Sequence, residues 1–168
     1  MEQLKDRILL PTAAEIAKER AFVVAKINEI GEKRLREGIL AAVDVRKKAY
    51  PPYSGYMVGA TVICKSGDSY SSCNAEAASY SGTDHAEKSA ITKAISSGEI
   101  QKSGEEFIEA VIVSHLGASG PCGECRQRIA EHCQNALVLD VDGDGNIQAV
   151  TSLKALFFYG FTPSHVRK

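Results

Sequence analysis

Apolar residues recur along the chain with helical spacing in its first third. Over residues 13–35 they fall near every 3.6 positions, which predicts a helix-rich segment. Gly31 and Gly38 weaken this helix, because glycine disfavours a helix interior. A second helix is expected over residues 39–50, where the proline pair at 51–52 ends it.

The rest of the chain alternates between strand and helix patterns. Strands are expected at 56–64, 70–73, 107–115, 136–141 and 146–151, and the strand at 107–115 has the continuous apolar run of a buried strand. Helices are expected at 85–97, 122–133 and 153–158. This alternation predicts an α/β protein with three layers, α-β-α, around a mixed five-stranded sheet.

Composition narrows the class of protein. A chain of 168 residues with 44% apolar and 24% charged residues fits a globular domain with a proper core. The net charge of -1 disfavours a nucleic-acid polymer as partner, and the sequence has no 18-residue apolar run that predicts a membrane span. Five cysteines, an odd number, fit reduced thiols or metal ligands, and we expect a cytoplasmic protein.

One set of residues has the chemistry of a metal site. Cys122 and Cys125 form a C-x-x-C pair at an expected helix start, where the helix dipole favours thiolate. His85 begins another expected helix. Two helix starts side by side would bring one imidazole and two thiolates together, and three protein ligands with an open fourth position are typical of a catalytic zinc.

Glu87 indicates that the metal site formed by His85, Cys122 and Cys125 is catalytic. H-x-E followed by P-C-x-x-C is the signature of zinc deaminases, in which the glutamate is the general acid/base. The alternatives are a redox cysteine pair, a histidine that only caps its helix, and a glutamate that only complements the helix dipole. Each motif alone is weak evidence, whereas the two motifs together, each opening a helix, favour the zinc site.

Other residues of reactive type have simpler interpretations. Residues 140–147, DVDGDGNI, match the start of an EF-hand loop, but position twelve is Thr151 and the flanks are expected strands, so a hairpin turn is favoured. The remaining cysteines and histidines are expected to be core thiols and solvated or structural imidazoles: Cys64, Cys73, Cys133, His115, His132 and His165.

Five blocks of the sequence, in order, resemble the small nucleoside cytidine deaminases. They are AYPPYSGYMVGATV from residue 49, CNAEAASY from 73, HAEKSAITKAISSG from 85, GPCGECRQ from 120 and LFFYGFTP from 156. The resemblance covers about residues 39–163 and implies a cytidine-deaminase-like domain at 36–168, preceded by a helical extension at 1–35.

The resemblance implies roles residue by residue. It gives zinc ligands (His85, Cys122 and Cys125), a proton shuttle (Glu87) and substrate-binding residues (Tyr56, Asn74, Glu76, Ala86 and Phe161). The implied reaction is zinc-dependent hydrolytic deamination of cytidine or deoxycytidine, one zinc per chain, as in pyrimidine salvage. Family sites are completed across subunits, so Phe161 would reach a neighbour's pocket and the protein would be a homo-oligomer, a tetramer before a dimer.

The chain also departs from the family pattern. Tyr56 stands where the family usually has Phe, His85 where short members have Cys, and Ala77 where a second Asn is usual. A modified aminopyrimidine nucleoside, such as a nucleoside antibiotic, is therefore an alternative substrate. A zinc-stabilised binding module without activity is a further alternative, which the intact Glu87 disfavours.

Overall fold

A computed structural model describes residues 11–117 and 119–166 of the chain. Its centre is a five-stranded sheet in the order β2-β1-β3-β4-β5. The strands are β1 (Gly59–Cys64), β2 (Ser69–Cys73), β3 (Ile108–Ser114), β4 (Leu137–Val141) and β5 (Ile147–Ser152). Only β3 and β4 are parallel, and the other neighbours are antiparallel. The predicted mixed sheet is confirmed.

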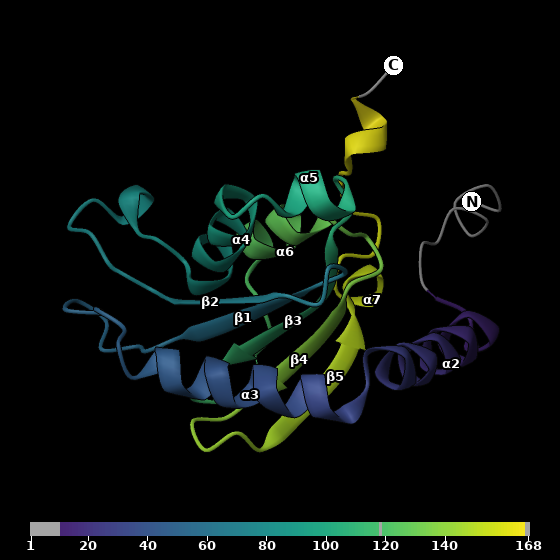
Figure 1. Cartoon of the computed structure of the whole chain (residues 1–168), viewed down its shortest axis with the longest axis horizontal. Coiled ribbons are helices and arrows are strands. Elements are labelled where there is room, and N and C mark those ends of the chain that lie inside the picture. Colours follow the sequence, from purple (N-terminus) through teal and green to yellow (C-terminus); the bar gives the residue numbers. More distant parts are fainter. Residues whose placement is uncertain (1–10, 118, 167–168) are drawn as a thin grey trace, which may run out of the picture.

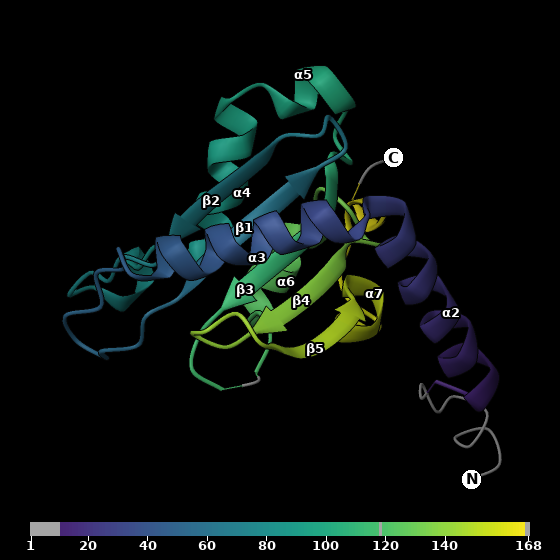
Figure 2. The same ribbon diagram turned by 60° about the horizontal axis from the view of Figure 1, so that its bottom comes forward.

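Helices cover both faces of the sheet, as Figures 1 and 2 show. Helix α3 (Glu32–Arg46) lies on one face, and α4 (Ala86–Ser96) and α6 (Gly123–Ala130) lie on the other. Side chains of β3 alternate between the two. Ile112 packs in the core cluster of α3, whereas Val111 packs in the cluster of α4 and α6. The three-layer α-β-α prediction is confirmed.

The helices before the sheet differ from the predicted boundaries. Helix α2 (Ala13–Ile30) begins with a capping box of Thr12 and Glu15 and extends beyond the sheet (Figure 2). It ends at Gly31, whose φ of 86° favours glycine, and α3 begins at once. The prediction of a helix through residue 35 and a new one from 39 was therefore wrong.

Gly38 lies inside α3 instead of ending a helix. A Cβ at this position would lie 2.6 Å from Cδ1 of Ile112 on β3. The missing side chain lets α3 approach the sheet closely, so the glycine serves packing. The sequence pattern alone does not distinguish this use of glycine from a helix break.

Short elements complete the fold. They are η1 (Tyr80–Gly82), α5 (Glu99–Ser103), α7 (Leu153–Leu156) and η2 (Pro163–His165). The last predicted helix is two residues shorter than expected, because α7 ends at Leu156 and not at Phe158. No helix within the described ranges is long and apolar enough to cross a membrane.

Candidate active site

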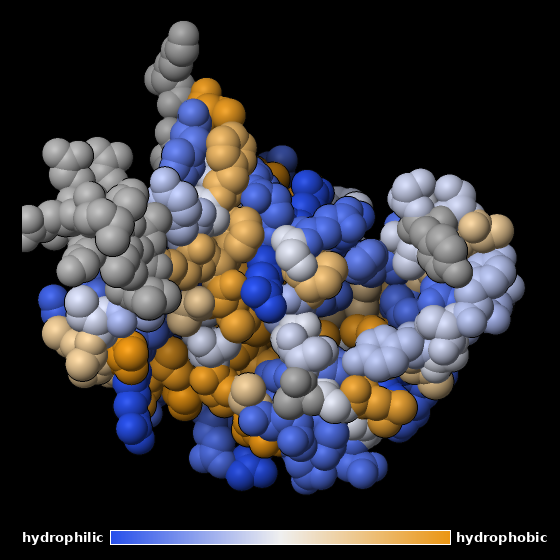
Figure 3. All heavy atoms as spheres, turned by 180° about the vertical axis from the view of Figure 1, so that it is seen from behind, coloured by the Kyte–Doolittle hydropathy of each residue, from blue (hydrophilic) through white to orange (hydrophobic). Residues whose placement is uncertain are grey.

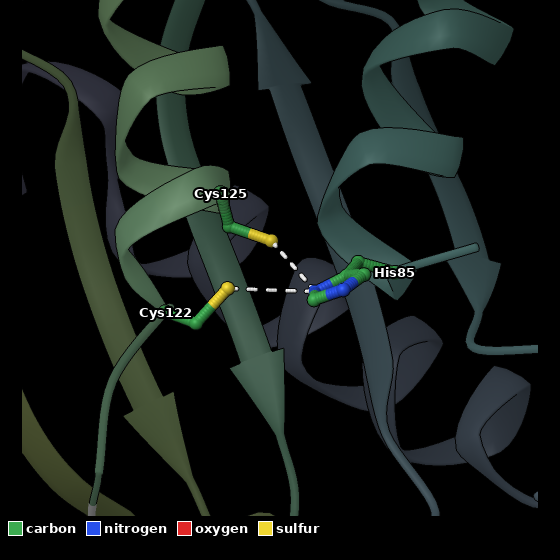
Figure 4. Close-up of side chains that lie close together, drawn as sticks. All are labelled: His85, Cys122 and Cys125. Carbon is green, nitrogen blue, oxygen red and sulfur yellow. Dashed lines mark hydrogen bonds between the residues drawn. The ribbon is translucent and has the colours of Figure 1, made fainter. Parts of the chain in front are cut away.

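Two helix starts meet near the end of the sheet where parallel strands β3 and β4 finish. His85 is the N-cap residue of α4, and Cys122 is the N-cap residue of α6. Both have extended backbone, with ψ of 143° and 169°, and Cys125 follows in the first turn of α6. Figure 4 shows the three side chains pointing toward one another from the two helices.

The geometry of these three side chains fits zinc. Nδ1 of His85 lies 3.4 Å from Sγ of Cys122 and 3.4 Å from Sγ of Cys125. In a tetrahedral site, Zn–N and Zn–S bonds of ~2.0 and ~2.3 Å place nitrogen and sulfur about 3.5 Å apart. All three ligand atoms lie within 4.8 Å of one another. The expected triad is therefore assembled with the spacing that a tetrahedral metal requires.

The electrostatics of the bare site favour a thiol at Cys125. Burial, and then the nearby Glu87 carboxylate, raise the pKa of the Cys125 thiol far above its usual range. Desolvation and the Glu87 carboxylate thus oppose the helix dipole, which favours thiolate. A bound dication reverses this balance, since coordination deprotonates a thiol.

The far side of the His85 ring faces charged groups. Its Nε2 lies 3.6 Å from Oε2 of Glu124, and Oε1 of Glu124 accepts a hydrogen bond from Nζ of Lys88. That hydrogen bond lowers the pKa of Glu124 and keeps the carboxylate charged. A carboxylate beside Nε2 favours a proton there and leaves Nδ1 with a free lone pair for a metal.

A pocket of about 280 Å³ opens beside the three ligands. Its lining includes every predicted substrate-contacting and catalytic residue except Phe161: Tyr56, Asn74, Glu76, Ala86 and Glu87. Glu87 is only 5% exposed, so its carboxylate is largely shielded from bulk solvent. The structure thus brings a buried carboxylate and two residues of the metal triad, His85 and Cys122, into one small pocket.

Asn74 and Glu76 hold the loop that forms one wall of the pocket. The Asn74 side chain accepts from the Val58 N–H at 2.8 Å and donates to the Tyr56 carbonyl at 2.9 Å. Glu76 accepts from the backbone N–H of Tyr53 and from both the N–H and the hydroxyl of Ser54. The Ser54 hydroxyl, with these backbone groups, lowers the pKa of Glu76. Both side chains keep acceptor or donor capacity for a ligand.

Two further residues of this region, His115 and Asp140, were not predicted to belong to the site. His115, expected to be solvated or structural, is 2% exposed and lines the pocket. Asp140, the first residue of the calcium-like loop, turns inward, and its Oδ1 lies 2.6 Å from His115 Nε2. The available signal was the histidine that ends the predicted buried strand at 107–115, because functional sites gather at the carboxyl ends of such strands.

Two other expectations concern residues near these elements. Residues 142–146 form a tight turn in which the Asp142 carboxylate accepts from the Asp144 and Asn146 N–H groups, in agreement with the hairpin interpretation. Phe161 is 58% exposed and stacks on His165, with ring centroids 5.4 Å apart. It is absent from the lining of the pocket in this chain.

Comparisons with known proteins agree with this geometry. The family described as "Cytidine and deoxycytidylate deaminase zinc-binding region" matches residues 32–140. A cytidine deaminase of Sporosarcina psychrophila is 38% identical over 112 residues, which are 66% of this chain and 79% of the relative. A cytidine deaminase of Halalkalibacterium halodurans is 37% identical over 114 residues, 67% of this chain and 83% of the relative.

A solved structure also matches. The crystal structure of cytidine deaminase from Burkholderia pseudomallei superposes with a TM-score of 0.67 at 32% identity, covering 74% of this chain and 97% of that one. The fold and the site define a zinc-dependent deaminase of the α/β class. The chain belongs to the cytidine and deoxycytidylate deaminase zinc-binding family.

Proposed function

We propose that this protein is an enzyme that hydrolyses cytidine and deoxycytidine to the corresponding uridine and ammonia. The observation that carries the proposal is the buried Glu87 carboxylate in one pocket with His85 and Cys122, whose metal triad Cys125 completes. A binding module would not need a buried carboxylate there, because burying a charged group is costly.

The chain's own residues account for the proton transfers. Zinc, when bound by His85, Cys122 and Cys125, activates water for attack on a ring carbon. Glu87 takes a proton from the attacking water and delivers it to N3 of the pyrimidine, and a second proton passes through the same carboxylate to the departing ammonia. The burial of Glu87 strengthens its interactions with the substrate, since charges act more strongly at low dielectric.

Recognition of the sugar falls to the opposite wall in this proposal. Asn74 and Glu76 provide hydrogen-bonding groups for a ribose hydroxyl, and Tyr56 provides a ring against which a base can stack. Ala86, fully buried at the first position of α4, contacts the base edge. A site of this kind rejects ligands that lack the hydroxyl.

The experiment that tests the function is a spectrophotometric assay with purified protein and a panel of aminopyrimidines. We expect turnover of cytidine and deoxycytidine, with cytosine a very poor substrate. Turnover confined to a modified aminopyrimidine nucleoside would keep the chemistry and replace the substrate. Zinc-loaded protein that deaminates no member of the panel would contradict the proposal.

Assembly and location are further parts of the proposal. Apolar side chains gather beside α2 and α7, where a groove of about 810 Å³ is lined by residues such as Phe22 and Phe158 (Figure 3). With the exposed Phe161, this face supports a homo-oligomer, a tetramer before a dimer. Five free cysteines support a reducing, cytoplasmic location. We keep the division into an extension at 1–35 and a catalytic domain at 36–168.

A further inference from the structure

A row of polar contacts runs from the wall of the pocket into the core. The Tyr56 hydroxyl lies 2.9 Å from Nδ1 of His115. On the other side of the imidazole, Nε2 lies 2.6 Å from Oδ1 of Asp140. The second oxygen of Asp140 accepts from the Gly120 N–H at 3.2 Å. Three segments that are distant in the sequence, around Tyr56, at 115–120 and around Asp140, therefore meet through these contacts.

The burial of this pair is unusual for a structural element. His115 and Asp140 are 2% and 4% exposed; His115 directly follows β3, and Asp140 is the penultimate residue of β4. A buried pair of ionisable groups adds little stability compared with apolar residues of the same size. A role in the site accounts for the pair better than a role in stability.

Tyr56 is the residue on which this pair acts. Its side chain is 40% exposed, so surrounding residues hold the ring on one side only. Its hydroxyl is held twice, by His115 Nδ1 and by the Leu116 carbonyl at 3.1 Å. The rings of Tyr56 and His115 lie with centroids 6.0 Å apart and an angle of 37° between their planes. Without the hydroxyl contacts, the ring is free to leave the pocket wall.

We propose that His115, held by Asp140, is a positioning residue that fixes the Tyr56 ring as the wall against which the substrate's base packs. The inference rests on the proposed function and deepens it, because it explains how residues outside the metal triad hold the substrate-binding side chain in place. An aromatic wall that is ordered before binding saves the entropy that a mobile side chain loses when ligand binds.

The first test removes only the hydroxyl. Tyr56→Phe keeps the ring and loses both hydroxyl contacts, so KM for cytidine should rise about 3- to 10-fold, the scale of one side chain ordered on binding. The value of kcat should stay within about 2-fold, because Glu87 and the triad are untouched. An unchanged KM in Tyr56→Phe would overturn the proposal.

A matched control removes a tyrosine hydroxyl elsewhere. The Tyr70 hydroxyl donates to a buried carboxylate, Glu99, at 2.9 Å, outside the pocket. Tyr70→Phe should lower the melting temperature without moving KM. An equal rise of KM in Tyr70→Phe would mean that the loss of overall stability, and not the position of the Tyr56 ring, weakens binding. That result would also overturn the proposal.

A double-mutant cycle tests whether His115 acts on substrate binding through Tyr56. His115→Gln should raise KM as Tyr56→Phe does, and the double variant should be no worse than the weaker-binding single variant, because both remove one contact. Effects that multiply in the double variant would show that the two residues act separately. All variants should retain wild-type zinc content.

Binding of the product separates this inference from the proposed function. Uridine is the product and is not turned over, so its affinity, measured by calorimetry, tests the position of the Tyr56 ring independently of catalysis. If the wild type deaminates nothing, the proposed function fails. A 3- to 10-fold weaker affinity for uridine in Tyr56→Phe would then still support the positioning role, and equal affinity would overturn it.

Discussion

Nδ1 of His85 lies 3.4 Å from Sγ of Cys122, although the two residues are 37 positions apart in the sequence. Each is the N-cap residue of a helix, and the two helices pack on the same face of the sheet. Because N-cap residues have extended backbone and precede the helix, their side chains project from the helix ends and meet between them. The metal site is thus a product of two neighbouring helix starts.

Metal content is the most direct test of this arrangement. We expect one zinc per chain in protein purified without chelator, and Cys125→Ser should lose the metal and melt at lower temperature, because metal binding is coupled to folding. Cys73→Ser provides the control, since this half-buried thiol lies outside the triad and should leave zinc unchanged. Elemental analysis giving less than about half an equivalent for the wild type would count against the site.

Glu87→Gln should separate catalysis from structure. The amide keeps the shape of the side chain but cannot carry protons, so turnover should fall at least ~10²-fold while zinc content and melting temperature change little. Glu37→Gln is the control, because Glu37 is exposed on α3 and pairs only loosely with Lys33 at 3.9 Å. Near-normal turnover in Glu87→Gln would end the proposed mechanism.

Glu76→Ala should test whether Glu76 binds a ribose hydroxyl of the substrate. We expect the variant to lose ~2–3 kcal/mol of transition-state stabilisation with cytidine, as measured by kcat/KM, which is the scale of a lost charged hydrogen bond. The effect on free cytosine should be small. Ser54→Ala tests the loop contact by itself, because it removes the hydroxyl that donates to Glu76 and keeps the carboxylate. Equal efficiency on cytosine and cytidine in the wild type would show the ribose assignment to be wrong.

Acid sensitivity should arise in part at Glu99. Burial raises the pKa of this carboxyl, but hydrogen bonds from Ser66, Lys102 and Tyr70 outweigh it, so the pKa lies below its usual 4.5. A carboxyl whose pKa is lower in the folded state stabilises the fold above the unfolded pKa, and this stability is lost as pH falls through the folded pKa.

The measurement is the melting temperature of wild type and Glu99→Gln between pH 7 and pH 3. The wild type should be the more stable at neutral pH, and its advantage should shrink below about pH 4.5, where the unfolded carboxyl begins to protonate. A difference that is constant across this range would contradict the assignment.

The exposed aromatic C-terminus should be covered by other copies of the chain. Phe158, Tyr159 and Phe161 are 49%, 83% and 58% exposed, more apolar surface than a monomer usually leaves in one segment. Light scattering at micromolar concentration should therefore give a homo-oligomer, and Phe161→Ala should weaken assembly or activity. A monomeric wild type would contradict the prediction and leave Phe161 without its proposed role.

The sequence by itself determined the order of elements and the chemistry of the metal site. Short apolar runs bounded by turn residues indicated the strands, because a buried sheet requires apolar residues along its strands. The two short motifs around His85 and Cys122 indicated the triad, because metal ligands at a helix start have a local signature. Local patterns of this kind can be recognised in the sequence without knowledge of the tertiary contacts.

Only the tertiary structure decided the uses of glycine and of buried polar residues. Gly31 ends a helix and Gly38 admits close packing, although the sequence presents both as interruptions of one pattern. His115 meets Tyr56 and Asp140 only because parallel strands β3 and β4 end side by side. Such contacts join positions distant along the chain, and their partners are fixed by packing of the whole sheet, which no local pattern records.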